Sequence, residues 1–229
     1  MNIRRLLYFF VCCTLVLVAR AEIASKSILI IGDSLTAGYG LPDPATQAYP
    51  ALLQRKLDEI ASSPASASVT ALPIGRWRVV NAGISGDTSS GGLRRIDWVS
   101  RQPVAILVLA LGSNDGLRGL DPALVTKNLS ALVARVRAKN PDVRVLLIGQ
   151  RMPISMGDYA ARFDGVFPAL ARENGWAFVP FLLEGVGGEA ELNQADAIHP
   201  NEAGHARMAE TVWAGLAPLL VVAATPDAP

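Results

Sequence analysis

The stretch ILIIGDSLTAGYG, residues 28–40, decides how the rest of the chain is interpreted. A run of apolar residues ends abruptly at the small, polar Gly32-Asp33-Ser34, and further glycines follow. Such a run predicts a buried strand, and the glycines predict a tight turn after it. A serine at the tip of a strand is either part of a plain turn or a nucleophile. The remaining sequence has to distinguish these two possibilities.

Length and composition favour one globular domain. The chain has 229 residues, of which 51% are hydrophobic and 18% are charged. This length allows a sizeable core, and the composition is not that of a disordered protein. The formal net charge of +1 gives no bulk electrostatic preference for nucleic acid or for an anionic membrane.

The N-terminus has the pattern of a signal peptide over residues 1–21. Arg4 and Arg5 precede an apolar segment over residues 6–18, and Ala19-Arg20-Ala21 fits a cleavage site. The alternative is an uncleaved anchor, but the apolar segment is shorter than the roughly 20 residues of a membrane span. We therefore expect cleavage after Ala21, a single domain over residues 22–229 and a periplasmic or secreted protein without stable membrane insertion.

Cleavage changes the chemistry available to the mature chain. Both cysteines, Cys12 and Cys13, leave with the signal, so neither a disulfide nor a thiol is expected. Lys+Arg falls from 21 to 18 against 20 acidic residues, which gives a net charge of about −2. Packing alone has to stabilise the fold.

The sequence alternates between apolar runs and helical patterns, which predicts a parallel sheet with helices on both faces. Residues 61–75, rich in Ala, Ser and Pro, are expected to form a surface loop. The expected strands cover residues 28–31, 78–81, 104–111, 143–148 and 176–180, and the expected helices cover residues 49–60, 88–101, 121–139, 159–174 and 202–220.

Polar motifs follow the expected strands at the edge where such sheets bind their ligands, beyond the carboxyl ends of the strands. The first strand is followed by Ser34, and a further polar motif precedes the last helix. The motifs are GDS at residues 32–34, NAGISGDTS at 81–89, GSND at 112–115 and DAIHPNEAGH at 196–205. One or two such motifs could be ordinary turns, but four at one edge favour a functional site.

A serine nucleophile needs a base, and the base is nearly always histidine. The chain has two histidines, His199 and His205. Pro200 disfavours a helix through His199, and Asp196 is close enough in sequence to orient the imidazole. His205 falls within the expected last helix, where a packing or capping role fits. We favour His199 as the base; the alternative is that Asp196 caps a turn and His199 is polar surface.

The oxyanion formed during attack needs hydrogen-bond donors. The Ser34 N–H lies at a helix start and has no acceptor within the helix. Gly83 and Gly86 both qualify as loop donors, because a glycine lets a carbonyl approach the backbone. Asn114 offers a side-chain N–H, although asparagine is more often a turn residue. Three neighbouring acids are expected to be caps or turn residues: Asp33, Asp87 and Asp115.

These motifs, in this order, resemble the four blocks of the SGNH, or GDSL, hydrolase family: GDSL at residues 32–35, Gly86 in ISGDTS, GSND at 112–115 and DAIHP at 196–200. NAGISGDTSSGGL and LALGSNDGLRG are most similar to its bacterial branch of thioesterase I, lysophospholipase L1 and arylesterases. The resemblance covers nearly all of the expected mature chain. It implies a flavodoxin-like three-layer α/β/α sandwich with about five parallel strands.

The resemblance also implies roles. Ser34 would be the nucleophile, His199 the base and Asp196 its orienting partner. The Ser34 N–H, the Gly86 N–H and the Asn114 side chain would form the oxyanion hole, so the resemblance favours Gly86 over Gly83. The implied substrate is a small-molecule ester or thioester. Neither a cofactor nor a metal is expected, since a chain with two histidines and no mature cysteine supplies few zinc ligands.

The sequence departs from this branch in two loops. PISMG at residues 153–157 stands where the branch often has Pro-x-Asn-Tyr-Gly, and the loop over residues 61–75 is longer than usual. Both changes affect the expected acyl-chain preference and leave the catalytic blocks intact. Two other functions stay open: a carbohydrate O-deacetylase of the same family and a non-catalytic periplasmic binding module.

Overall fold

The computed structural model describes residues 26–63 and 77–220. The expected signal peptide and most of the expected loop over residues 61–75 lie outside the described residues. The part of that loop that is described differs from the prediction, because α3 (Tyr49–Ser62) continues through Ala61 and Ser62.

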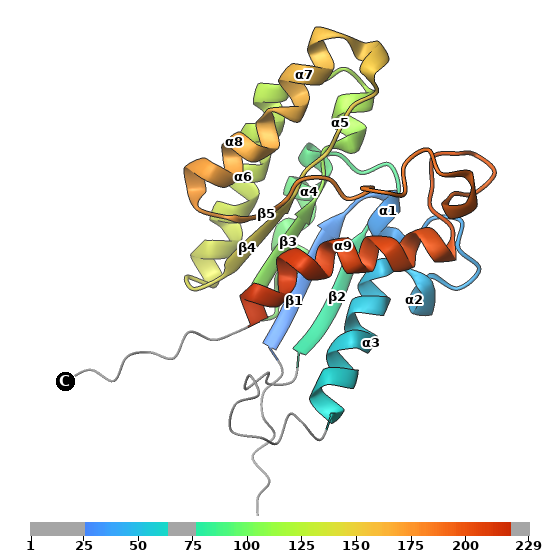
Figure 1. Cartoon of the computed structure of the whole chain (residues 1–229). Coiled ribbons are helices and arrows are strands. Elements are labelled where there is room, and N and C mark those ends of the chain that lie inside the picture. Colours follow the sequence, from blue (N-terminus) through green and yellow to red (C-terminus); the bar gives the residue numbers. More distant parts are fainter. Residues whose placement is uncertain (1–25, 64–76, 221–229) are drawn as a thin grey trace, which may run out of the picture.

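A parallel sheet of five strands forms the centre of the molecule, with the order β2-β1-β3-β4-β5 (Figure 1). Its strands are β1 (Lys26–Gly32), β2 (Trp77–Gly83), β3 (Ile106–Ala110), β4 (Arg144–Ile148) and β5 (Ala177–Val179). Every residue of β3 is buried, as expected for a strand covered on both faces. The strand order reverses direction at β1, and such a point is where open α/β sheets bind their ligands.

Helices cover both faces of the sheet, which confirms the predicted three-layer sandwich (Figure 1). On one face, Ile28 and Ile30 pack against α3 and α9 (Glu202–Leu220). On the other face, Leu29 and Ile31 face a layer formed by α4 (Ser89–Val99), α6 (Pro122–Lys139), α7 (Asp158–Asp164) and α8 (Val166–Asn174). Each fully buried aliphatic side chain contributes roughly 1.5–3 kcal/mol of transfer free energy.

The helix expected over residues 159–174 is interrupted, which corrects the prediction. α7 ends at Asp164 and α8 begins at Val166, with Gly165 between them. Pro168 explains the break: it has no N–H to donate to the carbonyl of Asp164, and its ring would clash with that carbonyl in a continuous helix.

Several short helices were not predicted from the sequence, because a segment of four or five residues is too short to show a helical periodicity. Two of them, α1 and α5, begin directly after β1 and β3 and carry residues of the candidate site. The short elements are α1 (Ser34–Ala37), α2 (Pro44–Gln47), α5 (Ser113–Leu117), and the 3₁₀ turns η2 (Ile154–Met156) and η3 (Ala190–Leu192). Across residues 26–63 and 77–220, no helix is long and apolar enough to span a membrane.

Candidate active site

A tight strand-to-helix turn presents Ser34 at the carboxyl edge of the sheet. Gly32 ends β1, Asp33 is the N-cap of α1, and Ser34 is the first helical residue. A Cβ on Gly32 would lie 1.9 Å from Thr36 Oγ1, so only glycine permits this turn. The N–H of Ser34, at the first helical position, has no acceptor within the helix. Ser34 is partly exposed and accessible to a ligand.

His199 and Asp196 meet Ser34 in a continuous hydrogen-bonded series. His199 Nε2 lies 3.0 Å from Ser34 Oγ, and His199 Nδ1 lies 2.7 Å from Asp196 Oδ2. The other oxygen of Asp196 accepts the backbone N–H groups of Ile198 and His199, at 3.0 and 2.9 Å. Ala197 adopts a left-handed conformation with φ 57°, which closes this turn. The structure therefore brings the three sequence-predicted residues together.

The charge of Asp196 determines which imidazole nitrogen carries the proton. The hydrogen bond from the His199 backbone N–H, with the bond from the imidazole, lowers the pKa of Asp196 to about 2. Asp196 is therefore a carboxylate at neutral pH and can only accept hydrogen bonds. Nδ1 of a neutral His199 must then donate, which leaves Nε2 as the acceptor for the Ser34 hydroxyl.

His205 has the packing role predicted for it. Its side chain is buried, and its Nδ1 accepts the backbone N–H of Tyr49 at 3.2 Å. Burial lowers the pKa of His205 to about 4, so the ring is neutral under most conditions. The bond ties the start of α3 to α9.

The two loop glycines considered as oxyanion donors differ in their surroundings. A Cβ on Gly83 would lie 2.3 Å from the backbone nitrogen of Ala37, so α1 packs directly on Gly83. Gly86 has a left-handed φ of 77° and is exposed. Its carbonyl accepts a hydrogen bond from Arg118 at 3.0 Å. Of the two, Gly86 therefore lies at the surface, and Gly83 serves the packing of the turn.

Asn114 follows β3 and lies next to the serine turn. Its Nδ2 is 3.5 Å from Oδ2 of Asp33, whose other oxygen accepts the Leu35 N–H as the predicted cap. The sequence did not indicate how deeply Asp33 is buried. Burial raises its pKa to about 6, and the hydrogen bond from Leu35 opposes this shift.

Two further residues, which were not predicted from the sequence, contact the site. Arg95 on α4 pairs with Asp87 at 2.7 Å and donates to the carbonyl of Gly32 at 3.2 Å. The ring of Tyr39 lies 4.6 Å from the ring of His199. These contacts are long-range, and local sequence spacing carries no signal for them.

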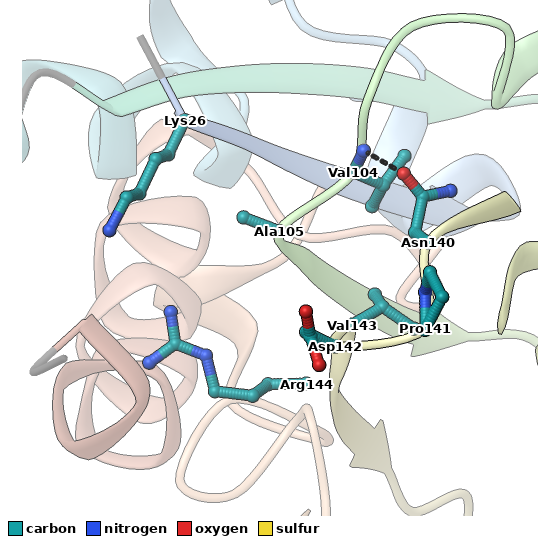
Figure 2. A pocket seen from close by; sticks show the side chains of 8 residues that line it. All are labelled: Lys26, Val104, Ala105, Asn140, Pro141, Asp142, Val143 and Arg144. Atoms are coloured by element: carbon teal, nitrogen blue, oxygen red, sulfur yellow. Dashed lines mark hydrogen bonds between the residues drawn. The ribbon is translucent and has the colours of Figure 1, made fainter. Parts of the chain in front are cut away.

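The opposite edge of the sheet holds a separate cavity of about 740 Å³ (Figure 2). It is lined by Lys26, Val104, Ala105 and residues 140–144, which open or precede strands and so mark the amino edge. Figure 2 shows the side chains of Lys26 and Arg144 extending toward it. None of these lining residues is a serine or a histidine, so the cavity has no part in the chemistry at Ser34.

Metal ligands are not clustered in the described part of the chain: no group of three or more His, Cys, Asp or Glu there could hold a metal ion. A serine, a histidine and a carboxylate in hydrogen-bonded series at the carboxyl edge of a parallel sheet are the arrangement of serine hydrolases.

Comparison with known proteins agrees with this class. Residues 30–207 match the model of the GDSL-like Lipase/Acylhydrolase family. The chain is 40% identical to Esterase TesA of Pseudomonas aeruginosa, over 91% of this chain and 96% of that protein. It is 36% identical to Thioesterase 1/protease 1/lysophospholipase L1 of Escherichia coli K12, over 90% of each chain.

Solved structures show the same relationship. A crystal structure of TesA has a TM-score of 0.73 at 41% identity and covers 85% of this chain and 99% of that one. The psychrotrophic esterase EstA from Pseudoalteromonas has a TM-score of 0.72 at 29% identity, over 86% of this chain and 99% of that one. The chain belongs to the GDSL-like lipase/acylhydrolase family, as its motifs predicted, and is a hydrolase acting on ester bonds.

Proposed function

We propose that the protein is an exported serine esterase that forms an acyl-enzyme on Ser34. The hydrogen-bonded series from Ser34 Oγ through His199 to Asp196 carries this proposal, at 3.0 and 2.7 Å. A base within this distance of the hydroxyl, oriented by a carboxylate, is the geometry that activates serine.

In the first half of the reaction, Ser34 Oγ attacks the carbonyl carbon and its proton passes to His199 Nε2. The carbonyl electron pair moves to the oxygen, where the N–H groups of Ser34 and Gly86 and the Asn114 amide stabilise the charge. His199 then donates the proton to the leaving alcohol or thiol as the carbon–heteroatom bond breaks. Asp196 stabilises the imidazolium that exists between these two transfers.

In the second half, water replaces the leaving group. The water oxygen attacks the acyl carbon while His199 takes a proton from the water. His199 then returns the proton to Ser34 Oγ as the ester bond between the acyl group and Ser34 breaks. The products are a carboxylic acid and free Ser34. Every proton in this cycle moves through His199.

The proposed substrates are small carboxylic esters or thioesters. The names of the relatives, an esterase, a thioesterase/lysophospholipase and an arylesterase, support this class. The signal-peptide pattern over residues 1–21 supports export to the periplasm or the medium. The nearly balanced charge gives no support for nucleic acid as a partner.

The test is hydrolysis of p-nitrophenyl esters of increasing acyl length by residues 22–229, beside a Ser34→Ala variant. The proposal predicts turnover that falls by orders of magnitude in the folded variant. Near-normal turnover by that variant would remove Ser34 from the mechanism. Turnover of acetylated sugars alone would instead favour the O-deacetylase. Export is tested by sequencing the N-terminus of the protein from the periplasm or medium, which should begin at Glu22.

A further inference from the structure

Behind the proposed oxyanion hole lies a network of buried polar side chains that the mechanism above does not use. Asp115 Oδ1 accepts the hydroxyl of Ser89 at 2.6 Å, and its Oδ2 accepts the Ser89 backbone N–H at 2.7 Å. Asn128 on α6 donates to the hydroxyls of Ser89 and Ser90 at 2.9 and 2.8 Å. The side chains of Asp115 and Ser89 have no solvent exposure.

The two bonds to Ser89 require the acceptors of a carboxylate. Ser89 is the first residue of α4, where the backbone N–H groups lack helical acceptors and the helix dipole favours negative charge. An asparagine at residue 115 would keep one acceptor oxygen and place an NH₂ group where the second oxygen stood. One of the two Ser89 donors, the backbone N–H or the hydroxyl, would then lose its acceptor. That change would leave a polar group unsatisfied in a site closed to water, which is costly.

The network connects the two loops that carry the proposed oxyanion donors. Asp115 directly follows Asn114 on α5, and Ser89 follows the turn that contains Gly86. A bond from Asp115 to Ser89 therefore fixes the loop after β3 against the loop after β2. We call this contact between Asp115 and Ser89 the junction of the two loops. Asn128 on α6 donates to the same serine, so a third element also supports the junction.

We propose that Asp115 is a positioning residue that sets the separation between Gly86 and Asn114 in the oxyanion hole. This inference rests on the proposed function, because it assigns a purpose to the spacing of donors proposed above. A misplaced donor weakens the transition state more than the bound substrate, since charge develops only in the transition state. Loss of the junction should therefore lower kcat and leave KM nearly unchanged.

The experiment is a double-mutant cycle with Asp115→Asn and Asn114→Ala, measured on a p-nitrophenyl ester well below the unfolding temperature of each variant. Asp115→Asn should lower kcat by about 10-fold to 10²-fold, less than the loss of a donor outright. In the Asn114→Ala background, the same substitution should cost less than about threefold, since residues acting through one group are not additive.

Asn140→Ala is the matched control. Asn140 also braces a loop, accepting the Val104 N–H at 2.8 Å, but it lines the cavity at the amino edge. It should lower the unfolding temperature without lowering kcat. If Asp115→Asn does not fold, Ser89→Ala replaces it. This variant removes the hydroxyl and its bonds to Asp115 and Asn128 but keeps the bond from the backbone N–H to Asp115, so it should give the same non-additive pattern with a smaller loss.

Each outcome separates this inference from the proposed function. An unchanged kcat in Asn114→Ala alone would contradict the proposed oxyanion hole itself. A large loss in Asn114→Ala with kcat retained in Asp115→Asn would overturn only the positioning role. Equal losses from Asp115→Asn in both backgrounds, or a matching loss in Asn140→Ala, would also overturn it, because they indicate a general structural effect.

Discussion

Nε2 of His199 lies 3.0 Å from Oγ of Ser34, although 165 residues separate the two along the chain. The packing of α9 explains this proximity. Its buried residues Met208, Val212 and Leu216 fix the helix to the face of the sheet that also carries α3. The segment before the helix is thereby brought to the carboxyl edge, beside the turn after β1 (Figure 1). The reacting pair is thus held by the core of the molecule.

Replacing Asn114 by alanine should remove one donor to the oxyanion. We expect kcat to fall by about 10²–10³ with little change in KM, as for other oxyanion donors. Stability should change little, since the hydrogen bond from the amide to Asp33 is long, at 3.5 Å. Steady-state kinetics check this, with Asn174→Ala as the control, because Asn174 bonds the Leu170 carbonyl at the end of α8. A decrease in kcat of less than about threefold would show that Asn114 acts only as a turn residue.

Replacing Asp196 by asparagine should disrupt the orientation of His199. The amide can donate to Nδ1 and hold the ring in the wrong tautomer, so kcat should fall by roughly 10²–10⁴. The matched control is Asp97→Asn, which alters an exposed ion pair with Arg135. Equal kcat values for the two variants would show that Asp196 only shapes its turn.

His205 should make the protein less stable at acid pH. In the unfolded chain its pKa is about 6.5, whereas burial lowers the pKa in the fold to about 4. The unfolded state therefore binds a proton first as the pH falls, and stability is lost between these two values. The loss should be about 3 kcal/mol, at 1.36 kcal/mol for each pKa unit.

The measurement is urea unfolding of the wild type and of His205→Asn, whose Oδ1 can accept the Tyr49 N–H in place of Nδ1. As the pH falls from about 6.5 to about 4, the free energy of unfolding of the wild type should decrease more than that of the variant. Parallel stability curves would contradict the buried neutral histidine. The difference is needed because Asp33 acts in the opposite sense: burial raises its pKa to about 6, so the fold gains stability as Asp33 is protonated.

Replacing Gly83 by alanine should destabilise the turn that presents Ser34. The new Cβ would lie 2.3 Å from the backbone nitrogen of Ala37, and backbone cannot move aside as a flexible side chain can. We expect a cost of about 1–3 kcal/mol and lower activity. Gly187→Ala is the control, because its Cβ would meet nothing closer than 3.6 Å. The measurement is the thermal unfolding temperature of the two variants. An equal decrease in both would contradict the close packing of α1 on Gly83.

Much of the architecture could be predicted from the sequence. Buried apolar runs and helical periodicity identified the five strands and the longer helices, because these patterns extend over enough residues to be distinctive. The turn around His199 was also predictable, since Asp196 and Pro200 act locally. The break at Gly165 has a local signal as well, Pro168, which the prediction of one helix over residues 159–174 did not take into account.

Other features depend on contacts between distant segments. The burial of Asp33, the bond from Arg95 to Gly32 and the junction of Asp115 with Ser89 arise only once the strands are assembled. Asp115 in particular was predicted as a turn or cap residue. It does cap a helix, but the helix is α4, which is remote from it in sequence.

The most direct test of the central claim is to label the protein with a fluorophosphonate, which transfers its phosphonyl group to an activated serine and releases fluoride. The modified residue is then located by peptide mass spectrometry. We expect one phosphonyl group on Ser34 and no labelling of folded Ser34→Ala. A label on another residue, or equal labelling of Ser34→Ala, would contradict the assignment of Ser34 as the nucleophile.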